Sequence, residues 1–450
     1  MKHAQPLSSA LTEQYERQYQ GNALLKATAN ALSRNSISDI SFDQSSLLED
    51  RFKFSIDIPT LPATNQKSSG RCWIFAALNV FRERIAKACH LTSFELSQNY
   101  VAFWDKYEKI NYFLESVIDR IEEAPDERTL CWVLDTGIQD GGQWDMVVNL
   151  VQKYGLVPMD AMPESHQSGH TAEMNQLINT KLRQSAAHLQ ALWQEKKNLD
   201  ALQTAKQAMM GEFYAICRAC FGEPPQHFDF EYVDKDNVYH VERNMTPQSF
   251  CETYIGAASL DAYLSIIHAP THNKPFNQTY TVDYIGNVVG GKPVHYLNLS
   301  MEEMSNLIIQ QLKDGEVVWF GSDVGHYRDR KSGIWNNHAF DYNTAFGMDF
   351  SLSKSDMLLY RHSAMTHAMV ITGVNLDENG QPNRWKIQNS WGDDSGEKGY
   401  YLMNHGWFEQ FVYQAVIHQK YLSDAQAAFL QTEPVHLDPW DPMGTLALCD

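Results

Sequence analysis

Apolar residues recur at helical spacing directly after Cys72. They are Ile74, Phe75, Leu78, Phe81 and Ile85. Steps of one, three and four residues place such side chains on one face of an amphipathic helix. We therefore expect a buried helix that begins at or just before Cys72.

A second helical pattern covers residues from about 171 to 221, which are rich in Ala, Gln, Leu, Lys and Glu and have few helix breakers before Gly211. Pro224 and Pro225 end this pattern. Residues 7–35 are also helical in pattern but mostly polar. The sequence thus predicts a helical insertion in mid-chain and a surface arm at the start.

Strand-like segments dominate the second half of the chain. They are rich in aromatic and β-branched residues, and turn signals such as Asp314-Gly315 and Asn379-Gly380 lie between them. The expected strands cover residues 279–284, 316–320, 366–372 and 384–389. We expect an α+β fold with an arm (1–60), a helical half that carries the helix at Cys72 (61–165), a mainly helical insertion (166–275), a β-rich half (276–435) and a tail (436–450).

Composition and charge narrow the class of protein. The chain has 450 residues, 43% of them apolar and 12% aromatic, which is enough for a large core and excludes wholesale disorder. The net charge of −19 repels nucleic-acid phosphates, and no run of Lys and Arg forms a basic stripe. Nucleic acid is therefore not an expected partner, although a basic patch assembled in space stays open.

The chain carries no pattern of a signal peptide or a membrane span. Residues 1–28 are too polar for a signal core, and no later stretch offers about 18 consecutive apolar residues. The seven cysteines are an odd number spread along the chain, which does not indicate a disulfide framework. We expect a cytoplasmic protein without a membrane partner.

Candidate chemistry begins at Cys72, because a thiol at the start of a buried helix lies in the positive end of the helix dipole, which favours the nucleophilic thiolate. Thiol catalysis also needs an imidazole and a group that orients it. His367 starts one strand-like run and Asn389 ends the next. If these strands are adjacent, the Asn389 carbonyl can accept the Nδ1 proton of His367, and the Trp391 ring can cover that hydrogen bond.

Each of these residues also has an ordinary structural interpretation. Cys72 alone could be a buried hydrophobe, His367 is one of 17 histidines, and Asn389 could belong to a simple turn. Elsewhere, Cys217-x-x-Cys220 with His227 lacks a second ligand pair at zinc-finger spacing. We expect no metal and no cofactor.

Taken together, these motifs resemble papain-like cysteine peptidases and, more narrowly, the bleomycin hydrolase and aminopeptidase C family. The likeness runs from about residue 10 to the C-terminus. It rests on Gln66-Lys67-Ser68-Ser69-Gly70-Arg71-Cys72-Trp73, Ser97-Gln98-Asn99-Tyr100, Asp140-Gly141-Gly142-Gln143-Trp144-Asp145, Trp319-Phe320-Gly321-Ser322-Asp323-Val324-Gly325, Met365-Thr366-His367-Ala368-Met369-Val370 and Asn389-Ser390-Trp391-Gly392.

The resemblance implies a papain-like fold with a helical left half and a β-sheet or barrel right half, and it implies a role for each site residue. Cys72 would be the nucleophile, His367 the general base and then acid, and Asn389 the residue that orients His367. Gln66 would share the oxyanion hole with the Cys72 backbone N–H. Gly141 and Gly142 would form the turn against which the substrate backbone lies.

The resemblance also implies an assembly and a substrate class. In this family, insertions build a helical arm, and protomers form a homohexameric ring whose active sites face an internal channel. Unfolded oligopeptides would enter and be trimmed from the amino end, and amides of bleomycin-like compounds could also be hydrolysed. The alternative is a papain-like ring, inactive or active, that serves as a binding scaffold or nucleic-acid binder.

Family members place their own C-terminus in the cleft, where it blocks the non-prime side and offers a carboxylate to the substrate's α-ammonium group. The resemblance therefore implies that residues 436–450 enter the cleft and that Asp450 binds substrate. Members tend to end near Ala447, whereas this chain adds Leu448, Cys449 and Asp450. Either these residues are trimmed, or Asp450 supplies two carboxylates.

Overall fold

The structure is a computed structural model that describes residues 3–329 and 331–447. Helices dominate its first half. The arm contains α1 (Ser9–Gly21), α2 (Ala23–Leu32) and α3 (Ile37–Ser41). The helices that follow are α4 (Cys72–Cys89), α5 (Gln98–Asp119), α6 (Arg128–Thr136), α7 (Trp144–Tyr154), α8 (His166–Gly169), α9 (Ala172–Lys196), α10 (Leu199–Phe221) and α11 (Pro247–Tyr254).

The second half carries most of the strands. The strands are β1 (Ile56–Asp57), β2 (Phe228–Val233), β3 (Tyr239–Met245), β4 (Tyr263–Ile267), β5 (Gln278–Val282), β6 (Tyr296–Asn298), β7 (Val318–Ser322), β8 (Arg328–Asp329), β9 (Ile334–Trp335), β10 (His367–Leu376), β11 (Pro382–Gln388), β12 (Tyr400–Asn404), β13 (Val412–His418) and β14 (Val435–Leu437). Between them lie α12 (Met301–Lys313), α13 (Tyr342–Phe346), α14 (Lys354–Leu359), α15 (His405–Phe411) and α16 (Asp424–Phe429).

Helix α4 begins at Cys72, as the apolar spacing predicted. Its side chains are buried almost all around, and it packs against α5, α7 and strands β7 and β10. The helix ends where His90 adopts a left-handed conformation with φ of 53°. This burial holds the first turn of α4 firmly against the sheet.

The main sheet has the strand order β14-β5-β6-β4-β13-β7-β10-β11-β12-β9-β8, and β1 adds to β10. Apolar residues alternate between its faces. Trp319, Ala368 and Val370 belong to one core with α4, while Phe320, Met369 and Ile371 belong to a second core with α12 and α15. The four predicted strands are confirmed, each shifted by a few residues at its ends.

Strand β10 lies between β7 and β11 and is antiparallel to both. In this register Val370 pairs with Gln388, so the start of β10 lies beside the end of β11. On the other side, His367 pairs with Ser322 of β7. The antiparallel pairing therefore brings the start of β10, with His367, close to Asn389, which follows Gln388.

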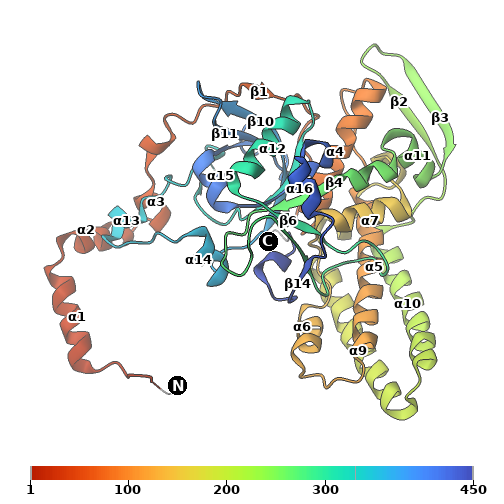
Figure 1. The fold of residues 1–450 in the computed structure, drawn as a ribbon, viewed down its shortest axis with the longest axis horizontal. Coiled ribbons are helices and arrows are strands. Elements are labelled where there is room, and N and C mark those ends of the chain that lie inside the picture. Colours follow the sequence, from red (N-terminus) through yellow and green to blue (C-terminus); the bar gives the residue numbers. More distant parts are fainter. Residues whose placement is uncertain (1–2, 330, 448–450) are drawn as a thin grey trace.

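The predicted helical pattern after residue 171 forms two helices, α9 and α10, which run beside α5 at one end of the molecule (Figure 1). A hairpin of β2 and β3 follows. Strand β4, which lies before residue 276, already belongs to the main sheet. On the opposite side in Figure 1, helix α1 of the arm extends away from the rest of the chain, whereas α2 and α3 contact α13.

Candidate active site

Cys72 occupies the first position of α4, and its side chain is fully buried. The Trp73 indole donates a hydrogen bond to the Asp140 carbonyl (2.6 Å), which fixes the first turn of the helix. The neighbouring Arg71 is buried in a bidentate pair with Glu164 (3.0 and 2.8 Å). The positive charge that the sequence places beside Cys72 is thus paired with a carboxylate.

His367 and Asn389 are joined by a 2.8 Å hydrogen bond between Nε2 and Oδ1. The Ser390 backbone N–H also donates to this Oδ1 (2.8 Å), so the oxygen of the Asn389 amide faces the ring and Nε2 carries the proton. The expected bond from Nδ1 is therefore wrong, because the imidazole is oriented with Nε2 rather than Nδ1 toward Asn389. Among the described residues Nδ1 has no hydrogen-bond partner, so in the neutral ring it is the acceptor.

Burial controls the charge of His367. Its side chain is fully enclosed, and this burial lowers the pKa of His367 to about 4, against the opposing effect of the Asn389 bond and with help from the positive charge of Arg328. Trp391 stacks on the imidazole with ring centroids 5.0 Å apart. The ring is therefore neutral at neutral pH while the cleft is closed.

Gln66 lies in the loop before Cys72, and its amide has a defined orientation. Ser390 Oγ donates to Oε1 (2.6 Å), and Nε2 donates to the Ser69 carbonyl (2.6 Å). The Gln66 backbone N–H also donates to the Ser390 carbonyl (2.8 Å). One amide hydrogen of Gln66 is left for another acceptor, and the Gln66 loop is joined to the segment that carries Asn389.

Gly141 and Gly142 form a turn that faces both α4 and the C-terminal tail. A Cβ on Gly142 would lie 2.5 Å from the Trp73 ring, and a Cβ on Gly141 would lie 2.9 Å from the Ala447 carbonyl oxygen. Gly142 forms an antiparallel bridge with Ala447, whose N–H donates to the Gly142 carbonyl (3.3 Å). Only glycine permits both close approaches.

The tail reaches the thiol of Cys72. Sγ of Cys72 donates a hydrogen bond to the Ala447 carbonyl oxygen at 3.5 Å, and Ala447 is fully buried. The carbonyl before the Ala447–Leu448 peptide bond therefore lies at the thiol. Asp450, for which the sequence implied a substrate-binding role, lies outside the described residues.

Several contacts hold the tail upstream of Ala447. Strand β14 pairs with β5 in parallel, and Asp441 forms an ion pair of 2.7 Å with the buried Lys274. The Arg128 guanidinium lies 3.7 Å from the Trp440 ring centroid. Close to the cleft, Gln143 Nε2 donates to the Thr445 carbonyl (2.7 Å). These contacts hold the tail in the cleft.

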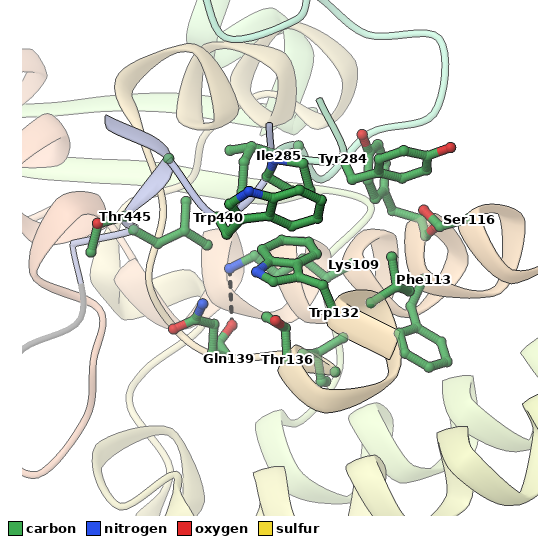
Figure 2. A pocket seen from close by; sticks show the side chains of 18 of the residues that line it. Lys109, Phe113, Ser116, Trp132, Thr136, Gln139, Tyr284, Ile285, Trp440 and Thr445 are labelled. Carbon is green, nitrogen blue, oxygen red and sulfur yellow. Dashed lines mark hydrogen bonds between the residues drawn. The ribbon is translucent and has the colours of Figure 1, made fainter. Parts of the chain in front are cut away.

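A cavity of about 480 Å³ lies beside the tail (Figure 2). Trp132 of α6 and Trp440 of the tail face it, and Lys109 of α5 reaches across its floor to the Gln139 carbonyl (3.0 Å). Thr445 and Leu446 form part of its wall. One side of the tail is therefore bordered by open space rather than by packed side chains.

Sequence reasoning missed the residues that support this site. Ser390 orients Gln66, Gln143 binds the tail, and Asp140 and Lys109 hold the glycine turn. One signal was present, because Asp105, Lys106 and Lys109 interrupt the apolar pattern of α5 and all three are buried. Buried charges in a helix indicate a polar network nearby.

Residues 3–329 and 331–447 contain neither a group of His, Cys, Asp and Glu placed to bind a metal ion nor a helix able to cross a membrane. Cys217 is buried in α10, and this burial raises the pKa of its thiol to about 12.

A thiol at a helix N-terminus beside a sheet that carries a His–Asn pair defines the class of papain-like cysteine peptidases. Comparison with known proteins agrees, since the Peptidase C1-like family matches residues 6–444. The chain belongs to the Peptidase C1-like family.

Within this family the chain is similar to proteins named aminopeptidase C. It is 46% identical to aminopeptidase C of Listeria monocytogenes over 95% of this chain and 93% of that protein, and 44% identical to that of Streptococcus thermophilus over 98% and 99%. The crystal structure of PepW from Lactobacillus rhamnosis HN001 matches with a TM-score of 0.96 and 45% identity over 98% of this chain and 99% of that one. The expected papain-like α+β fold is therefore confirmed.

Proposed function

We propose that the chain is a cysteine aminopeptidase that removes amino-terminal residues from oligopeptides. The nearly full-length similarity to proteins named aminopeptidase C supports this activity. The arrangement of Cys72, His367, Asn389 and Gln66 supports a thiol mechanism. Hydrolysis of the amide of bleomycin-like compounds belongs to the same proposal, because it breaks the same kind of bond.

The reaction follows from the roles of these groups. The Cys72 proton passes to His367 Nδ1, and the thiolate sulfur bonds to the substrate carbonyl carbon. The Cys72 N–H and Gln66 Nε2 bind the oxyanion. Collapse breaks the C–N bond, and His367 gives its proton to the leaving amine. Water, deprotonated by His367, then hydrolyses the thioester and restores the thiol.

The position of Ala447 is the observation that favours an exopeptidase. The tail lies antiparallel to Gly142 with its carbonyl at Cys72, which is the position that a peptide being cleaved would take. Because the tail fills the non-prime side, a substrate can extend only a short distance on the amino-terminal side of the cleaved bond. The tail must withdraw by about one residue to admit the amino-terminal residue of a peptide.

The same position favours trimming of the chain's own C-terminus. Attack of Cys72 on the Ala447 carbonyl would release Leu448-Cys449-Asp450 with an amino-terminal proton from His367, and water would then free a carboxylate on Ala447. That carboxylate would bind the α-ammonium group of substrates. Of the two alternatives for the tail, we therefore propose trimming over a binding role for Asp450.

We further propose that the protein is a cytoplasmic homohexamer with the five-part organisation expected from the sequence, except that β4 of the expected insertion (166–275) belongs to the main sheet. In the described part of the chain, helix α1 of the arm contains no buried residue. Tyr15 and Tyr19 on this helix and Leu7 just before it are exposed, which suits contact with another protomer. Light scattering should give a mass of six times 51.5 kDa. A monomer or dimer would contradict the proposed ring.

The activity is tested with amino-acid arylamides. Cys72→Ala should abolish release of the arylamine and labelling by a thiol-reactive epoxide, while the circular dichroism spectrum stays that of the wild type. Turnover by Cys72→Ala would contradict the thiol mechanism. Absence of turnover by the wild type, with epoxide labelling intact, would favour the alternative of a binding scaffold, and retention on a DNA column would identify its ligand.

Trimming is tested by mass spectrometry of the purified protein. The wild type should end at Ala447, and Cys72→Ala should keep its last three residues, because trimming needs the thiol. An intact wild-type mass would contradict the proposal. Removal of residues 447–450 should in addition allow internal cleavage of an amino-terminally blocked peptide.

A further inference from the structure

Asp140 is a buried carboxylate at the centre of the walls that enclose the cleft. Four donors converge on its two oxygens. Oδ2 accepts from the Gly70 backbone N–H (3.0 Å) and from the Thr171 hydroxyl. Oδ1 accepts from Lys106 Nζ (2.7 Å) and from Asn175 Nδ2 (2.9 Å). All of its acceptor positions are therefore used.

These donors come from parts of the chain that are distant in sequence. Gly70 lies in the loop between Gln66 and Cys72, which carries both proposed oxyanion donors. Thr171 and Asn175 lie at the start of α9, in the expected helical insertion. The Asp140 backbone carbonyl also accepts the Trp73 indole N–H. One residue thus connects the loop before the nucleophile, the residue after it and α9.

Asp140 also directly precedes the glycine turn, whose backbone is held from behind. Lys109 Nζ donates to the Gly141 carbonyl (2.6 Å) and to the Gln139 carbonyl (3.0 Å), the latter bond being visible in Figure 2. Its charge is balanced by Asp105 at 2.7 Å. The turn against which the peptide backbone lies is therefore fixed on both sides of Asp140.

Thr171 takes part in this network instead of capping its own helix. Thr171 is the N-cap of α9, yet its hydroxyl makes no capping bond and donates to Asp140 instead. Burial alone would raise the pKa of Asp140, but Lys106 and the hydrogen bonds outweigh it and hold that pKa well below its usual range. Asp140 is thus a carboxylate at any pH at which the enzyme works.

We infer that Asp140 is a positioning residue of the proposed aminopeptidase, which holds the oxyanion loop and the substrate-binding turn at a fixed separation. It acts through Gly70, Trp73 and the turn. Placement of the scissile carbonyl relative to the oxyanion donors depends on this separation, and an error of about 1 Å in such placement can cost 10²-fold in rate. The inference rests on the proposed function.

The test is Asp140→Asn, which keeps the size of the side chain but presents an NH2 group to donors. We expect kcat per active site to fall by about 10²-fold for an aminoacyl arylamide. Affinity for an aminoacyl aldehyde, whose adduct with Cys72 forms an oxyanion, should fall in parallel. Alkylation of Cys72 by iodoacetamide needs neither the turn nor the oxyanion donors, so its rate should change by less than about threefold.

Glu108→Gln is the matched control. Glu108 is a buried carboxylate on the same helix as Lys106, and it pairs with Lys153 and Tyr154 away from the cleft. The kcat per active site of Glu108→Gln should stay at the wild-type value. Equal losses in both variants, or an Asp140→Asn loss matched by slower alkylation, would overturn the inference, because general loosening or a changed thiol would then explain it.

Titration with a thiol-reactive epoxide counts the folded sites in each variant. If Asp140→Asn yields no folded sites, Thr171→Val becomes the test variant, since it removes one donor to Asp140 and keeps the carboxylate. A lowered kcat with a full titre supports the inference, and an unchanged kcat overturns it. If the wild type releases no amine, the proposed function fails, whereas wild-type turnover with an unaffected Asp140→Asn overturns only the positioning role.

Discussion

The side chains around Cys72 are oriented by groups that the reaction itself does not use. The Ser390 N–H fixes the Asn389 amide, and the Ser390 hydroxyl fixes the Gln66 amide. Asn389 in turn fixes the His367 tautomer with the proton on Nε2. A single serine therefore determines which atoms of two amides face the site, and sequence spacing alone gives no sign of this.

Ser390→Ala should lower kcat/KM for arylamides by about tenfold, because Gln66 would lose the bond that orients its amide. Gln66→Ala should cost about 10²- to 10³-fold, as for other oxyanion donors. The double variant should be no worse than Gln66→Ala, since Ser390 acts through Gln66. Additive losses in steady-state kinetics would show that Ser390 has another role.

At the scale of elements, the turn from Gln139 to Gly142 brings α4, α5 and the tail together. Lys109 holds it from α5, the Trp73 ring covers Gly142, and Ala447 bridges to it. The turn lies between α6 and α7 and is part of neither helix, so its shape depends on contacts from elements far apart in the chain.

Gly141→Ala should displace the tail and the substrate backbone, since the new Cβ would lie 2.9 Å from the Ala447 oxygen. We expect KM to rise by about tenfold or more and trimming to slow, with about 1–3 kcal/mol of strain as in other overpacked sites. Gly211→Ala is the control, because its Cβ would have no neighbour within 4 Å among the described residues. Equal kinetics in both variants would contradict the proposed substrate turn.

The elements themselves could largely be predicted from the sequence. The apolar spacing after Cys72 gave α4, and β-branched alternation gave β10 and β11, because these periodicities are local. Two features of the site could not be predicted in this way. They are the contact between Gly142 and Ala447, and the bond of His367 through Nε2, because both depend on how segments distant in sequence pack together. Strand β4 lies within the expected insertion (166–275), because its pairing with β6 and β13 cannot be recognised from the local sequence.

Across the whole molecule, buried histidines couple folding to pH. Burial lowers the pKa of His268 to about 3 and that of His367 to about 4. The folded state therefore binds fewer protons than the unfolded state between these values and about 6.5. Each of these two histidines therefore contributes stability that is fully present above about pH 6.5 and is lost as the pH falls toward its folded pKa.

Each of these two histidines should cost about 2 kcal/mol of unfolding free energy at pH 5 relative to pH 7.5. The melting temperature measured by calorimetry should fall accordingly. His268→Gln should show a shallower decline, because Gln does not titrate and can still donate to the Leu299 carbonyl that His268 contacts. An equal decline of the melting temperature in the wild type and in His268→Gln would contradict the buried neutral state of His268.

Because the tail is covalently attached, it acts as an intramolecular competitor of every peptide that enters the cleft. Its effective concentration is of the order of millimolar, whatever the concentration of enzyme. Apparent KM values then exceed intrinsic dissociation constants by the ratio of that concentration to the tail's own dissociation constant. This factor is the same for every peptide, so the tail lowers the occupancy of the cleft by all of them alike, and the anchoring contacts of Asp441 and Trp440 set how large the factor is.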